Sequence, residues 1–115
     1  MTTRNDVTGA QLWRTSDGLT WTQAVGDGFG DINNIKIESL VTYAGALYAA
    51  TLNFVTGVEI WRSSDGLNWA QINADGFGDS GNSSSLWSNG TVVFHGRLLI
   101  GSGGPIGGAI WQLQR

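Results

Sequence analysis

The sequence predicts an all-β fold, and three observations support this prediction. Apolar and polar residues alternate over short segments, and no segment keeps the 3.6-residue period of an amphipathic helix. The 115 residues include 18 glycines and one proline, which suits a chain that turns often and destabilises helix interiors. The segment WRTSDGLTW at 13–21 returns as WRSSDGLNW at 61–69, so a turn-rich unit occurs twice.

Each predicted strand is a short segment bounded by turn residues. In chain order, we expect strands within 9–15, 19–25, 39–43, 46–51, 57–63, 67–73, 91–95, 97–102 and 107–111. The pairs around Ala44-Gly45 and His95-Gly96 are the most apolar, so we expect them to be inner strands that are buried on both faces. Glycine in these two turns supplies the positive φ that a tight hairpin needs.

The repeat sets the organisation of the chain. Residues 8–31 align with 56–79 at an offset of 48, with 15 identities in 24 positions. Residues 41–51 match 92–102 at an offset of 51, after an insertion of three residues near 86–88. These matches predict one domain over 8–115 after an N-terminal tail, 1–7. Its repeats are 8–55, 56–106 and a partial third, 107–115.

A unit of this length is typical of a β-propeller blade. Each unit reads as four antiparallel strands, two inner and two outer, and the nine strands make about two blades per chain. A propeller ring needs about four to eight blades. We therefore expect the ring to be closed by homo-oligomerisation, with a trimer preferred and a dimer possible. The alternative is a natural or engineered fragment of a longer propeller.

Two heptapeptides follow the pattern Ser/Thr-x-Asp-Gly-x-x-Trp, at 15–21 and 63–69. This pattern resembles the Asp-box hairpin of sialidase-like (BNR-type) β-propellers. The resemblance implies a turn between the third and fourth strands of a blade, away from any catalytic centre. In such a turn the Asp carboxylate accepts amide hydrogen bonds and the Gly is left-handed. The expected structural residues are Ser16, Asp17, Gly18, Ser64, Asp65 and Gly66.

The chain does not carry the residues of a recognisable enzyme. The resemblance to sialidases is limited to the box, because their arginine cluster and glutamate-activated tyrosine have no clear counterparts here. His95 is the only histidine and lies in a predicted turn. The segments GDGFGD (26–31) and ADGFGD (74–79) read as connections that insert Phe29 and Phe77 between blades, with calcium or ligand contact as the alternative. We expect no enzymatic activity and no cofactor.

The six tryptophans permit two interpretations. Lectin-like propellers bind a sugar ring against an aromatic face and its hydroxyls with nearby polar groups, whereas packing between blades would use the same tryptophans structurally. The candidate sugar-binding residues are Gln11, Arg14, Trp21, Glu59, Arg62, Trp69 and Trp87. The two competing functions are thus a carbohydrate-binding module and a purely structural repeat without a ligand.

Charge and composition exclude several classes of partner. The net charge is −3 and Lys36 is the only lysine, so the basic stripe of a nucleic-acid or anionic-membrane binder is missing. There is no cysteine, which excludes disulfides and thiolate metal sites. The sequence has no signal-peptide pattern and no apolar run of about 18 residues, so we expect a soluble chain of unknown compartment.

Overall fold

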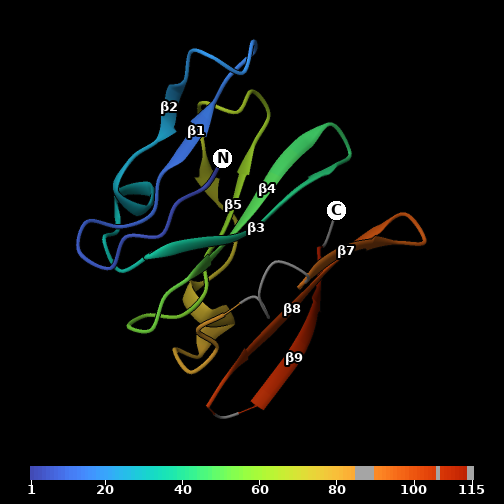
Figure 1. Ribbon diagram of the computed structural model, residues 1–115. Coiled ribbons are helices and arrows are strands. Elements are labelled where there is room, and N and C mark those ends of the chain that lie inside the picture. The colour runs from blue at the N-terminus through green and yellow to red at the C-terminus, as the bar shows by residue number, and fades with distance from the viewer. Residues whose placement is uncertain (85–89, 106, 114–115) are drawn as a thin grey trace.

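The computed structural model describes residues 1–84, 90–105 and 107–113, and it is an all-β structure of three antiparallel sheets, none of them closed (Figure 1). The first sheet pairs β1 (Leu12–Arg14) with β2 (Thr22–Val25). The middle sheet has the order β3 (Lys36–Tyr43), β4 (Ala46–Leu52), β5 (Ile60–Ser63) and β6 (Ala70–Gln71). The last sheet has the order β7 (Thr91–Phe94), β8 (Arg97–Gly104) and β9 (Gly107–Gln112).

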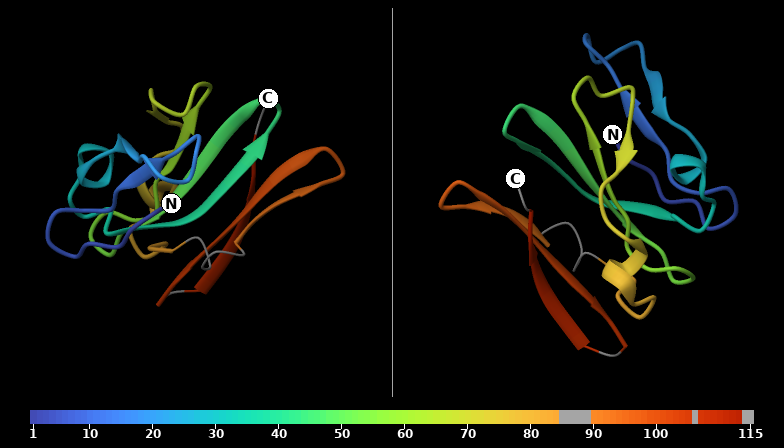
Figure 2. Two further views of the ribbon diagram at one scale, coloured as in Figure 1. Left: turned by 45° about the horizontal axis from the view of Figure 1, so that its top comes forward. Right: turned by 180° about the vertical axis from the view of Figure 1, so that it is seen from behind.

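Neighbouring strands in each sheet are consecutive in the chain, as the alternation of strands and turns predicts. The two inner hairpins close through Ala44-Gly45 and His95-Gly96, where φ is 50° and 80°, and 50° and 72°. Two central residues with positive φ match the right-handed twist of the flanking strands. The tips of the β3–β4 and β7–β8 hairpins point in similar directions (Figure 2).

The inner strand β4 of the middle sheet is buried on both faces because each neighbouring sheet packs against one face of that sheet. Towards the first sheet, Ile37 and Ala49 join a core with Leu12 and Val25. Towards the last sheet, Ile60 joins a second core that includes Tyr43, Tyr48, Leu98 and Ile100. Successive residues of a strand point to opposite faces, so Ile60 and Trp61 serve different cores.

The prediction that both apolar hairpins are buried on both faces is correct for β4 and wrong for β7. Val92, Val93 and Phe94 are 52%, 44% and 59% exposed. Edge position alone is not the reason, because β3 is the edge strand of the middle sheet and is largely buried. The reason is that the described chain has no further sheet beyond the last one to cover the outer side of β7. Phe94 corresponds, at the offset of 51, to Tyr43, which is only 8% exposed.

Two short 3₁₀ turns, η1 (Asp27–Gly30) and η2 (Asp75–Gly78), occupy the GDGFGD and ADGFGD connections, where the sequence predicts no helix. Positive φ angles at Gly28 and Gly76, and at the phenylalanines that follow, interrupt both turns. Gly57 packs against η2 so closely that a Cβ atom there would lie 2.5 Å from the Cα of Gly76. Glycine is therefore required where the strand-entry loop crosses the 3₁₀ turn.

The N-terminal segment pairs with β1. Thr2 forms a bridge with Leu12, the amide of Trp13 donates to the carbonyl of Met1 at 2.8 Å, and the amide of Gln11 donates to the hydroxyl of Thr3 at 2.9 Å. Residues 49–53 hold the same position beside β5, since Ala49 pairs with Trp61 and the amide of Glu59 donates to the hydroxyl of Thr51.

Asparagine side chains extend this equivalence past the strand. The Oδ1 of Asn5 accepts from the amides of Val7 and Thr8, and the Oδ1 of Asn53 accepts from those of Val55 and Thr56, all at 2.9 Å. The structural repeat of 48 residues thus includes residues 1–7, which the sequence alignment treats as a tail.

Candidate functional site

Both Asp turns have the hydrogen bonds that the sequence predicts. Asp17 Oδ1 accepts from the amides of Leu19 and Thr20 at 2.8 and 2.9 Å, and Asp65 Oδ1 accepts from those of Leu67 and Asn68 at 2.8 Å each. Gly18 and Gly66 have φ of 78° and 81°. These amide donors hold the pKa of both carboxyls below the usual range. The pKa of Asp65 is lowered further because the Asn68 side chain also donates to its carboxylate.

The hydroxyl that joins each turn differs from the one expected. Thr15 and Ser63 accept from the Gly18 and Gly66 amides at 2.9 and 2.7 Å and donate to the Asp carboxylates. Ser16 and Ser64 make no side-chain hydrogen bond among the described residues. The first hydroxyl of the motif faces the amides and the carboxylate of the turn, whereas the serine that precedes Asp is exposed to solvent.

Glu59, a predicted sugar-binding residue, lies inside the protein at 3% exposure. Its Oε2 accepts from Asn34 Nδ2 at 2.6 Å and from Trp61 Nε1 at 2.9 Å. Asn34 Oδ1 in turn accepts from Thr51 and Asn53 at 3.0 Å each. Burial raises the pKa of Glu59 in spite of the two donors, and within the described residues no cation pairs with it.

The structure does not bring Glu59, Arg62 and Trp69 together on one surface. Arg62 follows Trp61 in β5 and therefore points to the other face, where its Nε donates to the Tyr48 hydroxyl at 3.2 Å. Trp69 packs edge-on against Phe29, with ring centroids 5.5 Å apart. The residues of this predicted site are thus divided between two sheet interfaces.

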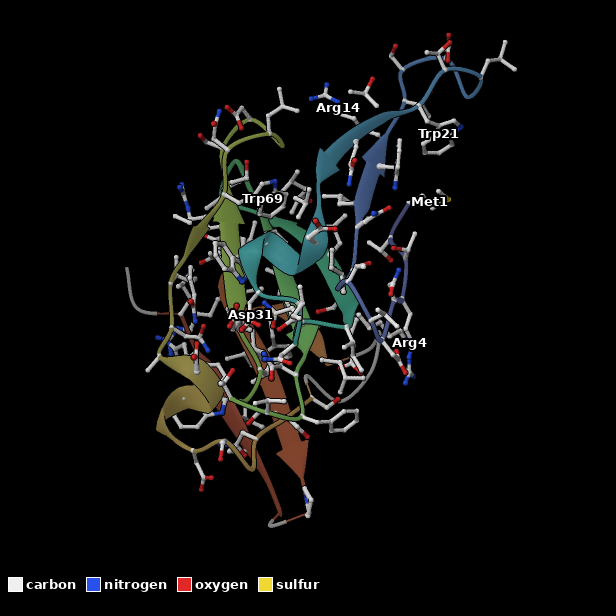
Figure 3. The ribbon with its side chains drawn as sticks, turned by 90° about the vertical axis from the view of Figure 1, so that its left-hand side faces the viewer. Met1, Arg4, Arg14, Trp21, Asp31 and Trp69 are labelled. Atoms are coloured by element: carbon white, nitrogen blue, oxygen red, sulfur yellow. The ribbon has the colours of Figure 1, made fainter. Side chains whose placement is uncertain are left out.

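The second predicted group is partly assembled. Gln11 is held by Trp13, whose Nε1 donates to its Oε1 at 3.1 Å. Arg14 and Trp21 line one pocket of about 430 Å³, together with Leu40, Leu47 and Asp65. We call it the Arg14 pocket; Figure 3 shows Arg14, Trp21 and Met1 near the same end of the first sheet. Trp21 is 42% exposed, whereas Trp87 lies outside the described residues.

The two sheet interfaces contain the same aromatic stack. Phe29 of η1 stacks on Trp61 with ring centroids 4.7 Å apart and an interplanar angle of 7°, and Phe77 of η2 stacks on Trp111 at 4.2 Å and 6°. Both phenylalanines therefore pack between sheets, as the sequence predicts. In the second interface a pocket of about 400 Å³ adjoins the stack, lined by Ile72, Phe77 and Trp111 among others; we call it the Phe77 pocket.

Two asparagines of this region, the buried Asn34 and the partly buried Asn82, are not among the residues predicted from the sequence. Asn34 donates from Nδ2 to the Gly28 carbonyl at 2.9 Å, and Asn82 donates in the same way to Gly76 at 3.0 Å. The two asparagines are 48 positions apart, as are Asn5 and Asn53. This spacing is the signal that would have found them, because it continues the repeat beyond its region of dense identity.

The described residues contain no group of three or more His, Asp or Glu side chains arranged to hold a metal ion. No helix in the described part of the chain is long and apolar enough to cross a membrane. In comparisons with known proteins, the chain matches no protein-family model, no curated protein and no solved structure.

Proposed function

We propose that this chain is a non-catalytic β-propeller module of the Asp-box type that assembles with copies of itself. The observation that carries the proposal is the difference in aromatic contacts between the two copies of one repeated tryptophan pair. Trp61 and Trp69 pack on Phe29, which follows the preceding sheet, whereas Trp13 and Trp21, at the same positions 48 residues earlier, contact no aromatic ring among the described residues.

The repeated stack supports the propeller arrangement. Two successive interfaces that use the same phenylalanine–tryptophan contact relate their sheets in the same way. Repeating one such relation gives a ring when the rotation closes and a filament when it does not. Three copies would supply about six four-stranded blades and two copies four or five, within the range of about four to eight blades in propellers. The trimer is our preferred assembly.

The solution mass tests this proposal directly. We expect light scattering or sedimentation to give two or three times the chain mass of 12.2 kDa. Replacing Trp21 with Ala should shift the population towards the monomer, because it removes an aromatic contact between copies. Leu19→Ala is a matched control, since Leu19 is 86% exposed in the Asp turn itself. A monomer at all concentrations would refute the proposal.

The Arg14 pocket supports sugar binding as a second function. It combines an exposed tryptophan with a guanidinium and the Asp65 carboxylate, and Arg14 makes no side-chain hydrogen bond or ion pair among the described residues. In the free chain, where Trp21 is not covered by another copy, a pyranose could stack on Trp21 while Arg14 binds its hydroxyls. Tryptophan quenching during titration with a glycan series should be saturable and reduced in Arg14→Ala but not in Arg97→Ala. No quenching by any sugar would favour the purely structural module.

A further inference from the structure

The outer edge of β8 has the geometry of a binding site for a β5-type strand, and β9 occupies it. β9 pairs antiparallel with β8 from Leu99↔Gln112 to Gly104↔Gly107. In the middle sheet, β5 pairs in the same way with β4. Trp111 lies opposite Ile100 and Trp61 lies opposite Ala49, and each tryptophan stacks on the phenylalanine of the preceding sheet.

The first sheet offers a second strand of the same type. β1 corresponds to β5 at the offset of 48, and both contain a Trp-Arg pair. β1 also brings the Asp turn, Trp21 and β2 with it, whereas the described part of the chain after β9 consists of Leu113 alone. The β1–β2 hairpin therefore contains more of the β5–β6 unit than the described residues from β9 onwards do.

The Phe77 pocket indicates what β9 leaves unfilled. In the first interface, Trp69 contacts the edge of Phe29 and, like Ala24, packs against the core of that interface. The counterparts of these two residues in the second interface are Phe77 and Ile72, and both line the Phe77 pocket. The residue that corresponds to Trp69 and is free to enter this pocket is Trp21 of another copy.

The hairpin tips of the inner strands support the same pairing between copies. Tyr43 covers Leu98 in the second interface, and its hydroxyl donates to the Gly96 carbonyl at 2.7 Å. At the offset of 51, the exposed Phe94 corresponds to Tyr43, whereas Leu47 and Gly45 correspond to Leu98 and Gly96. A contact between copies of the same kind would therefore join Phe94 of one copy to Leu47 and Gly45 of the other. Leu47 lines the Arg14 pocket, so Phe94 of one copy would cover Leu47 of the other.

We infer that the β1–β2 hairpin of one copy binds the β8 edge of another copy in place of β9. Trp13 takes the position of Trp111 and Trp21 enters the Phe77 pocket. Residues 1–3 leave the edge of β1 at the same time, because the incoming β8 pairs where Thr2 now meets Leu12. This inference rests on the proposed self-assembly and specifies its interface: in the free chain, β9 and the N-terminal segment cover the two edges that join in the assembly.

A reversible cross-link between β8 and β9 tests the exchange. The amide of Leu113 donates to the carbonyl of Leu98, so the next pair, Leu99↔Gln112, is a non-hydrogen-bonded pair with close Cβ atoms. The double variant Leu99→Cys, Gln112→Cys can therefore form a disulfide. Because the chain has no cysteine of its own, this disulfide would be the only one.

We expect the oxidised variant to remain a monomer and the reduced variant to assemble, with at least a tenfold difference in the monomer–oligomer equilibrium constant. Arg62→Cys with Ala70→Cys is the matched control, because it joins β5 to β6 in the middle sheet, which exchanges no strand. That control should assemble when oxidised. Equal assembly of the locked and reduced forms would overturn the exchange and leave self-assembly intact, whereas monomers in both forms and in the unmodified chain would overturn both.

Discussion

The two interfaces of the middle sheet use one stack but differ in completeness. On the first side, Phe29 contacts both Trp61 and Trp69. On the second side, Phe77 contacts Trp111, and a pocket of about 400 Å³ adjoins the pair. The aromatic stack therefore needs only the 3₁₀ turn and one strand, whereas complete packing around the phenylalanine also needs the tryptophan that follows the Asp turn of the next sheet.

The largest expected effect comes from the stacked tryptophans. Trp61→Ala should lower the free energy of unfolding by about 3–5 kcal/mol, because it removes a large aromatic side chain from a packed core. It also removes the donor to the buried Glu59. Trp111→Ala should cost less, since its stack is open on the side of the Phe77 pocket. Urea denaturation of the two variants measures the difference, and equal losses would contradict this account.

Trp21 and Trp69, which follow the two Asp turns, should differ in how much each contributes to the stability of the monomer. Trp69→Ala should destabilise the chain by roughly 1–3 kcal/mol through the lost contact with Phe29. Trp21→Ala should destabilise the monomer less than Trp69→Ala does, because Trp21 is 42% exposed. The measurement is denaturation at a concentration where both variants are monomers. A large loss in Trp21→Ala would show that its packing is internal.

The two Asp turns differ by two hydrogen bonds. Only in the second turn does Asn68 Nδ2 donate to Asp65 Oδ2, at 2.7 Å, and Trp69 Nε1 donate to the Gly66 carbonyl, at 3.3 Å. Asp65→Ala should therefore lower Tm more than Asp17→Ala. Because the pKa of Asp65 is lowered in the folded state, its contribution is present above the ordinary value of 3.8 and is lost as the pH falls below it. Thermal scans should show the deficit of the variant narrowing between pH 4 and pH 2. A constant deficit would refute the role of the carboxylate charge.

The smallest effect concerns the pair Glu59 and Gln11, which occupy the same position of the repeat. Each accepts from the neighbouring tryptophan, and Gln11 does so without a charge. Burial raises the folded pKa of Glu59 above 4.5, so Glu59 costs stability as the pH rises from that value through the folded pKa. Glu59→Gln should raise Tm at pH 7 by a few degrees, as roughly 1 kcal/mol shifts Tm of such a domain by about 4 °C.

A pH series provides the control for this variant. At pH 4 the wild-type and Glu59→Gln proteins should unfold at nearly the same temperature, because the glutamic acid is then mostly protonated in the folded state. A Tm of the variant below that of the wild type at pH 7 would mean that the carboxylate charge stabilises the Asn34 cluster.

The strands and turns could be predicted because their signals are local. Alternation places Leu12 and Trp13 on opposite faces, and Ala44-Gly45 and His95-Gly96 fix tight hairpins by backbone conformation. The candidate site was less predictable, because exposure depends on which sheet covers a face. Glu59 looks like a surface residue beside Arg62, yet it shares the face of Trp61, and that face is covered by Phe29 and Asn34.

The exposure of β7 was missed for the same reason. Its sequence is as apolar as that of β3, but burial on both faces requires layers that the sequence of one strand does not specify. The N-terminal pairing was missed because identity between 1–7 and 49–55 is limited to Thr3, Asn5 and Val7. These are the positions whose hydroxyl, amide and backbone groups make the repeated turn.

The equivalence of Asn5 and Asn53 has a consequence for protein engineering. Because both asparagines form the same loop, residues 1–48 contain one copy of every position of the structural period. A single polypeptide made of successive copies of this 48-residue stretch should fold into covalently linked sheets of uniform pitch, and circular permutants of it should keep that pitch.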